Sequence, residues 1–264
     1  LCKFPVLSIR YCSDSLVVVT EQELLLYVRV SEHIFKEEMC VEMSSNPHGL
    51  LDLRSDGKDC WLAFPSATAG HVQIIRYAIT TNEKRATVTK NLSIKTQTTF
   101  KAHESTLRTI KFNKKCTLLT TASEKGTLIR LYGRAGDTWK CLKEFKRGAY
   151  HSEVYSMAFS DNDSYICCTA ASGTLHIFCI NEQQSQENSS SFYDYFNFLS
   201  DTVAHPKSQF RSKNIEGKSI CSFKNNDEQT IYVVTDKGHF IELQFDFSSK
   251  ETEEKSRNVK MFMM

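Results

Sequence analysis

Residues 118–132 read LLTTASEKGTLIRLY, an apolar run, a turn around Gly126 and a second run of alternating apolar and polar residues. This pattern predicts a β-hairpin, because alternation places every second side chain on one face of a strand. The chain has only ten glycines, yet four of them share this local frame. They lie in Ala69-Gly70-His71-Val72, Lys125-Gly126-Thr127-Leu128, Ser172-Gly173-Thr174-Leu175 and Lys237-Gly238-His239-Phe240.

Each of these glycines lies between two predicted strands, and another short strand precedes each hairpin. The preceding strands are expected at residues 50–53, 107–112, 154–159 and 219–223, and an earlier group at 6–10, 16–19 and 24–30. The result is about five repeats of three or four strands. Such repeats predict the blades of an all-β propeller, since each blade buries its faces only against its neighbours.

A long insertion interrupts one repeat, from Asn181 to about Ile215. It begins polar, becomes aromatic and ends basic. The residues expected to enter a membrane interface are Phe192, Tyr193, Tyr195, Phe196, Phe198 and Leu199. Aromatic side chains favour that interface, although a helix or hairpin packed on the propeller flank is the alternative.

Charge is unevenly distributed along the chain. The net charge is only +2, but residues 101–150 hold twelve Lys or Arg against four Asp or Glu. A polyanion should therefore favour this region, whereas a solvated charged face is the plainer interpretation. Nucleic acid is a weaker candidate than lipid, because no aromatic platform is interleaved with these charges.

Several classes of function are disfavoured by the motifs. The ten cysteines show no C-x-x-C or His-paired zinc spacing, which favours reduced, buried thiols in a cytosolic protein without a metal or cofactor. No nucleophile elbow, Gly-rich phosphate loop or H-E-x-x-H motif is present, so we expect no catalysis. No apolar run approaches 18 residues, so membrane contact should be peripheral.

Two adjacent cations, Lys146 and Arg147, fall in the linker between strands expected at 139–145 and 154–159. Successive side chains of an extended linker point in opposite directions, which predicts two separate pockets. Nearby hydroxyl, imidazole and guanidinium groups are the donors that a phosphorylated inositol requires. Each of these residues is also an ordinary strand or turn residue when taken alone.

A family resemblance covers nearly the whole chain. Residues 118–130 resemble the blade motif of the PROPPIN (WIPI-like) phosphoinositide-binding β-propellers, and Phe145-Lys146-Arg147-Gly148 is similar to their Phe/Leu-Arg-Arg-Gly signature. Residues 173–178, 46–50 and 62–65 resemble other blades. The pattern looks closest to the branch of the third and fourth human WIPI proteins.

The resemblance implies a seven-bladed WD40-like β-propeller, a single domain over residues 1–264 with the intrablade insertion at about 181–215. Because only five repeats are recognisable and the chain starts at Leu1, we expect that N-terminal blades are missing. The first implied lipid pocket comprises His103, Thr121, Ser123, Thr127, Arg130 and Lys146. The second comprises Arg147, Ser172, Thr174, His176 and Arg211.

The implied ligands are phosphatidylinositol 3-phosphate and phosphatidylinositol 3,5-bisphosphate, bound by a monomeric cytoplasmic scaffold in autophagosome formation. Recruitment to autophagosome-precursor and endosomal membranes and an autophagy lipid-transfer protein as partner are also implied.

Two departures leave points open. Lys146 replaces an arginine and loses its forked geometry. The hairpin at 169–173 is one residue shorter than that at 121–126, so which hydroxyl faces the second pocket stays undecided.

The alternative is a WD40-like protein–protein interaction scaffold without lipid selectivity. Trp-Asp repeat endings are absent from the sequence, because Trp61 and Trp139 are followed by Leu and Lys. Selective phosphoinositide binding would separate the two interpretations.

Overall fold

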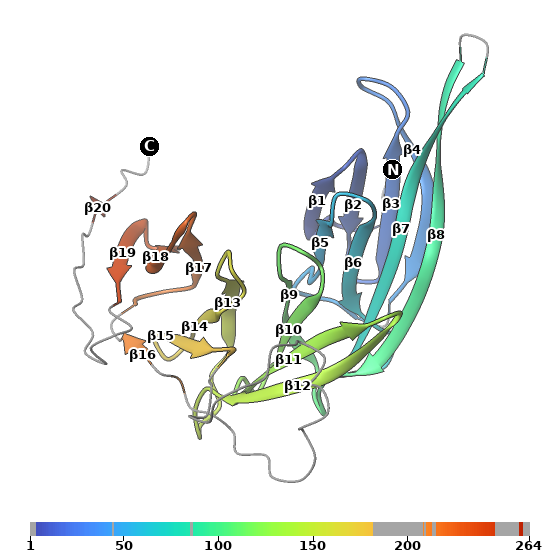
Figure 1. Ribbon diagram of the computed structural model, residues 1–264. Helices are drawn as coiled ribbons and strands as arrows, with labels where there is room; N and C mark the ends of the chain where they lie inside the picture. The colour runs from blue at the N-terminus through green and yellow to red at the C-terminus, as the bar shows by residue number, and fades with distance from the viewer. Residues whose placement is uncertain are drawn as a thin grey trace, which may run out of the picture. The chain divides into compact units, whose positions relative to one another are not determined.

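The computed structural model is all-β over the residues that it describes (Figure 1). These are residues 4–43, 45–84, 87–181, 208, 210–212, 215–245 and 259–260. They form five four-stranded sheets in which consecutive strands are neighbours, the meander expected of propeller blades. In the described part of the chain, no helix is long and apolar enough to span a membrane.

The sheets follow one another along the chain. The first contains β1 (Ser8–Cys12), β2 (Ser15–Val19), β3 (Glu23–Arg29) and β4 (Phe35–Glu42). The second contains β5 (Asp52–Ser55), β6 (Cys60–Pro65), β7 (His71–Lys84) and β8 (Thr87–Lys101). The third contains β9 (Leu107–Phe112), β10 (Leu118–Ser123), β11 (Leu128–Ala135) and β12 (Thr138–Lys146). The fourth contains β13 (Val154–Phe159), β14 (Tyr165–Ala170), β15 (Thr174–Cys179) and β16 (Phe210–Ser212). The fifth contains β17 (Ser219–Lys224), β18 (Asp227–Thr235), β19 (His239–Gln244) and β20 (Val259–Lys260).

These five sheets correspond to the five repeats in the sequence, while a count of seven blades stays a prediction. The four recurring glycines, at positions 70, 126, 173 and 238, all have positive φ, between 59° and 76°. Gly126 shows why a side chain is excluded: a Cβ there would lie 1.9 Å from the carbonyl oxygen of Ser152. Left-handed backbone and close approach together require glycine at this turn.

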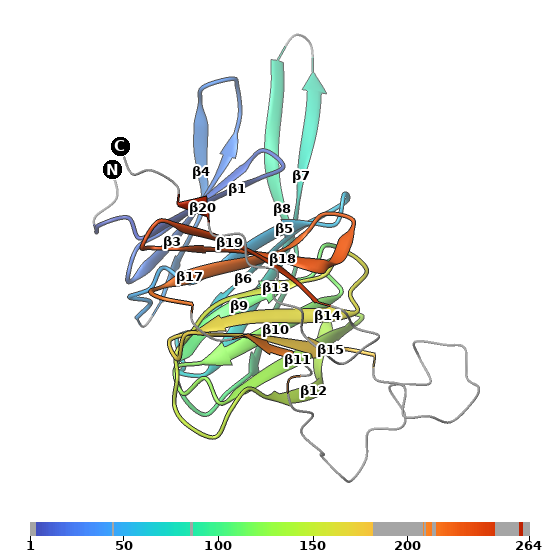
Figure 2. The same ribbon diagram turned by 90° about the vertical axis from the view of Figure 1, so that its left-hand side faces the viewer.

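The second sheet carries a hairpin that the sequence did not predict at its full length. Strands β7 and β8 pair continuously from His71–Lys101 to Lys84–Thr87, apart from a bulge at Arg76/Tyr77, and extend past β5 and β6 (Figure 2). The alternation of apolar and polar residues after Gly70 predicts a strand over residues 72–77 only. The outer part is rich in threonine, which favours strands but lacks the apolar alternation of a buried face.

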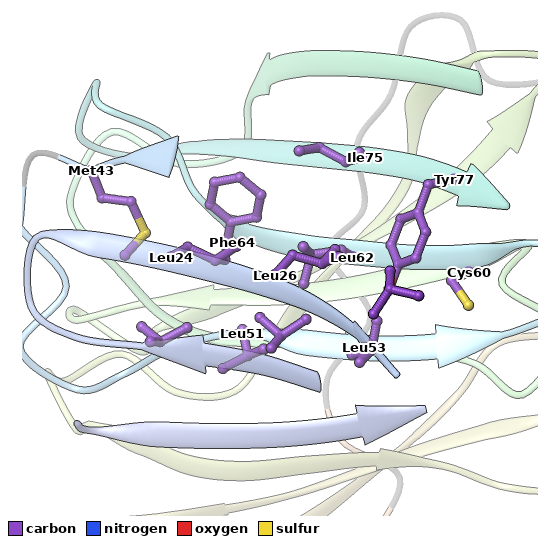
Figure 3. Packing of buried hydrophobic residues seen from close by; sticks show 13 residues of the cluster. Leu24, Leu26, Met43, Leu51, Leu53, Cys60, Leu62, Phe64, Ile75 and Tyr77 are labelled. Atoms are coloured by element: carbon purple, nitrogen blue, oxygen red, sulfur yellow. The ribbon is translucent and has the colours of Figure 1, made fainter. Parts of the chain in front are cut away.

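Two compact units divide the chain, one of residues 1–121 and 134–139 and one of 122–133 and 140–264. The first unit has a core between its first two sheets, where Leu24 and Leu26 of β3 pack with Leu62 and Phe64 of β6 (Figure 3). All four side chains are fully buried, and each such burial stabilises the fold by about 1.5–3 kcal/mol.

The second unit has its own core between the fourth and fifth sheets, with Cys167, Leu175, Ile177, Ile231 and Leu243 among its members. Each core thus joins two consecutive sheets, as blade stacking requires. A single domain over the whole chain stays a prediction.

Candidate functional site

The linker residues Lys146 and Arg147 differ in their exposure to solvent. Lys146 ends β12 and is exposed, whereas Arg147 retains only 7% of its accessible surface. The backbone N–H of Arg147 donates to the carbonyl of Thr127 at 2.9 Å, which fixes the linker against the hairpin turn before β11. The two adjacent cations therefore differ in their surroundings, since Lys146 is in solvent and Arg147 is nearly buried.

The Arg147 side chain is held by backbone carbonyls. Its Nε donates to the Gly126 carbonyl and its Nη2 to the Tyr150 carbonyl, the latter at 2.6 Å. Within the described residues no carboxylate pairs with it. Burial, reinforced by the charge of Arg211, lowers the pKa of Arg147 below its usual value. A buried guanidinium without a counter-ion is costly, so this position is suited to an incoming anion.

A chain of polar side chains runs inward near Arg147. The Ser172 hydroxyl is 2.8 Å from that of Thr174, and the Thr174 hydroxyl is 3.0 Å from His176 Nε2. The opposite ring nitrogen, Nδ1, is 3.0 Å from the Ser208 hydroxyl. Ser172 is exposed while Thr174 and His176 are almost fully buried, so the chain leads from solvent into the sheet.

His176 acts here as a neutral group. Burial, with smaller contributions from the charges of Arg147 and Arg211, lowers its pKa to about 4. Arg211 lies opposite His176 in the β15–β16 pairing and is exposed. The residues predicted for the second pocket therefore all lie in one unit, and they comprise two guanidinium groups, two hydroxyls and a neutral imidazole.

The structure also resolves the hairpin-length question. The turn at Gly126 closes through a bond from its N–H to the carbonyl of Ser123, and the turn at Gly173 closes on Ala170 in the same way. The turns are thus equal in length, so Thr169 aligns with Ala122 and faces away from the Thr121 position. Its hydroxyl donates to the Ser219 carbonyl at 3.0 Å.

The residues predicted for the first pocket are divided between the two units. In the first unit, His103 Nε2 lies 2.9 Å from the hydroxyl of Thr121, and both residues are buried. Backbone bonds from Ala102 and His103 to the Gly70 carbonyl fix the position of the imidazole. This pair is a polar group of the kind a headgroup would contact.

The other members belong to the second unit. Ser123 is buried at the end of β10, Thr127 is half-buried and Lys146 is exposed. Arg130 forms an ion pair with Glu144, Nε to Oε1, at 2.5 Å. The meeting of all six residues in one pocket stays a prediction.

Sequence reasoning missed three polar partners. Glu144 lies directly before the signature Phe145-Lys146-Arg147-Gly148, but its pairing with Arg130 follows from the β11–β12 neighbourhood and not from sequence spacing. Ser208 falls in the insertion. Ser152 accepts the backbone N–H of Ser172 at 2.8 Å. The only sequence signal for Ser208 and Ser152 as possible site residues is their short polar side chain.

Other predicted features fall outside the described residues, namely the six aromatic and apolar positions 192, 193, 195, 196, 198 and 199 of the insertion. Strand β16, which lies near the end of the insertion as predicted, pairs directly with β15. Among the described side chains, no group of three or more His, Cys, Asp or Glu residues is arranged to hold a metal.

Comparison with known proteins gives concordant results. A family model described as PROPPIN matches residues 3–209. Autophagy-related protein 18 from Debaryomyces hansenii is 27% identical over an alignment of 208 positions, which covers 69% of this chain and 36% of that protein. The chain thus spans about a third of the length of this relative.

Solved structures resemble the fold. Kluyveromyces lactis Hsv2 matches with a TM-score of 0.70 and 15% identity, over 97% of this chain and 73% of that one. KlAtg21, solved in complex with the coiled coil of AgAtg16, matches with a TM-score of 0.64 and 17% identity, over 98% and 71%. These likenesses establish the β-propeller fold. Because the family model covers most of the sequence, the chain belongs to the PROPPIN family.

Proposed function

We propose that this chain is part of a phosphoinositide-binding peripheral membrane scaffold that acts in autophagosome formation. The observation that carries the proposal is Arg147, a nearly buried guanidinium without a carboxylate partner among the described residues, beside the Ser172–Thr174–His176 chain. Two of its five N–H donors bind backbone carbonyls. The remaining donors supply charge-assisted bonds to a phosphate, and the hydroxyls satisfy further ligand oxygens.

The proposed ligands are phosphatidylinositol 3-phosphate and phosphatidylinositol 3,5-bisphosphate. The scaffold would be cytoplasmic and recruited to autophagosome-precursor and endosomal membranes, with binding in place of catalysis. Two headgroup pockets and the insertion at about 181–215 would act together, because linked weak contacts raise the overall affinity. Family membership and the relatives named autophagy-related protein 18 support this proposal.

Protein partners form part of the same proposal. KlAtg21 was solved with the coiled coil of AgAtg16, and on this likeness we propose a coiled coil as one class of partner for this chain. An autophagy lipid-transfer protein is the other. Placement in the branch of the third and fourth human WIPI proteins also remains a proposal.

Vesicle flotation tests the lipid proposal. Wild type, Arg147→Gln and the control Lys140→Ala, which removes an exposed cation from β12, the strand that precedes the Arg147 linker, are floated with vesicles that contain or lack each phosphoinositide. We expect selective flotation of wild type and of Lys140→Ala, and its loss in Arg147→Gln. Thermal melting establishes that Arg147→Gln is folded, and Thr174→Val provides a second variant that leaves the guanidinium in place.

Failure of the folded wild type to float with either lipid would refute the proposal. That result would favour the alternative, a WD40-like protein interaction scaffold without lipid selectivity. In such a scaffold the exposed cations would bind an acidic peptide.

A further inference from the structure

Tyr150 is the most exposed large apolar or aromatic side chain that the structure describes, with 87% of its surface accessible. It lies in the linker between β12 and β13, three residues after Arg147. Small or polar residues flank it, Ala149 on one side and His151 on the other. A single exposed aromatic residue needs no explanation by itself, but Tyr150 projects from a backbone that is held in place.

The backbone under Tyr150 is fixed on both sides. Arg147 Nη2 donates to the Tyr150 carbonyl at 2.6 Å, and the Arg147 guanidinium and N–H bind the carbonyls of Gly126 and Thr127. Two residues later, the N–H of Ser152 donates to the Lys125 carbonyl at 3.2 Å. The side chain therefore projects into solvent from an anchored loop, and a contact made by Tyr150 would lose little backbone entropy.

The surroundings of Tyr150 are those of a membrane-interface anchor. A tyrosine ring is apolar with a polar end, the combination that concentrates at the headgroup level of bilayers. The exposed cations Lys125 and Lys146 lie on the turn and strand tied to this linker, with one exposed acid, Glu124, beside Lys125. Each cation near an anionic leaflet adds about 1 kcal/mol to the attraction between the protein and that leaflet.

We propose that Tyr150 is a preorganised membrane contact that enters the headgroup region of an anionic bilayer beside the Arg147 anion site. The inference rests on the proposed function, since a lipid headgroup held by Arg147 brings the bilayer next to the Tyr150 backbone that the same guanidinium binds. Tyr150 acts on the membrane and not on the headgroup itself.

The test uses Tyr150→Ser and Tyr150→Trp in the full chain, with vesicles of phosphatidylcholine and phosphatidylserine that contain or lack phosphatidylinositol 3-phosphate. Ile220, 65% exposed on β17 in the same unit, provides the matched controls Ile220→Ser and Ile220→Trp. Both native tryptophans are buried, Trp61 at 1% and Trp139 at 8% exposure, so an introduced exposed tryptophan dominates any change in emission.

We expect Tyr150→Ser to weaken vesicle binding about three- to tenfold, as for partial burial of one aromatic side chain, while the affinity for soluble inositol 1,3-bisphosphate stays unchanged. Emission of Tyr150→Trp should shift to the blue on the phosphoinositide vesicles and be quenched by brominated lipid. Neither change is expected for the Ile220 variants.

Three outcomes overturn the inference, and they differ from one another. If wild type binds the vesicles and both Tyr150 variants behave like their controls, the tyrosine faces a protein partner instead. If Tyr150→Ser weakens soluble headgroup binding equally, the residue positions Arg147. If wild type binds no phosphoinositide vesicle, the proposed function itself fails and the inference fails with it.

Discussion

Replacing Glu144 by glutamine should strengthen anion binding at Arg130. The Arg130–Glu144 pair is a direct contact at 2.5 Å, and both side chains are partly exposed, at 23% and 21%. A phosphate that binds Arg130 must displace this carboxylate or share the guanidinium with it. Glu144 would thus compete with an anionic ligand for Arg130, whereas no described carboxylate pairs with Arg147.

The size of the effect follows from the exposure of the pair. Ion pairs of this kind are worth about 0.5–1 kcal/mol in water, so removing the competitor should raise the affinity for an anion about two- to fivefold. The assay is calorimetric titration with inositol 1,3-bisphosphate in an Arg147→Gln background, which removes the charge of the second pocket. Glutamine keeps the shape of the side chain, and we expect the urea midpoint to change little.

Glu124→Gln provides the matched control, because it removes the same charge from an exposed position in the turn before Gly126. We expect it to have little effect, since exposed charges are screened. An equal gain in both variants would show that only net charge matters. A loss of affinity in Glu144→Gln would refute competition and show that the carboxylate orients Arg130 for its ligand.

Three further predictions concern stability. Because the pKa of His176 in the folded chain, about 4, lies below its ordinary 6.5, stability should be complete above about pH 6.5 and fall as the pH drops toward 4. The total loss is about 3 kcal/mol, and urea midpoints of His176→Gln should lack this slope. Gly126→Ala should lower the free energy of unfolding by about 2–3 kcal/mol more than Gly136→Ala does. Both glycines have positive φ, but only at Gly126 does an added Cβ meet the Ser152 carbonyl. Equal melting temperatures of the two variants would contradict this prediction. Thr169→Val should cost about 1–2 kcal/mol in urea unfolding by leaving the Ser219 carbonyl without its donor, and an unchanged midpoint would count against that bond.

The sequence predicts the repeat well because its signals are local. The turn glycines at 70 and 126 have the positive φ that their shared sequence frame implies, and the apolar runs around them become strands. Hydrophobic alternation suffices for this, since it reports on adjacent residues only. The outer part of hairpin β7–β8 escapes the same reasoning, because its strands are polar and pair without an apolar face over much of their length.

The candidate site, like the fold, can be predicted from the sequence only in part. Residue type and order indicate Arg147, Thr174 and His176, and these lie in one polar cluster of the second unit. The pairing of Arg130 with Glu144 depends on which strands are neighbours and in what register, and the loss of charge on His176 depends on burial. Neither the Arg130–Glu144 pairing nor the neutral state of His176 can be predicted from the sequence alone, because both depend on tertiary packing.

The charge states in the second pocket determine how its binding should respond to pH. His176, with a pKa near 4, carries no charge between pH 5 and 8, so the positive charge of the pocket comes from Arg147 and Arg211. Arginine stays protonated throughout this range even when burial lowers its pKa. The protein side of the proposed interaction would therefore be constant and the ligand would titrate, since a phosphomonoester gains its second negative charge at about pH 6. Binding should strengthen between pH 5 and 7 as the phosphate becomes a dianion, which is opposite to the response of a site that depends on a protonated histidine.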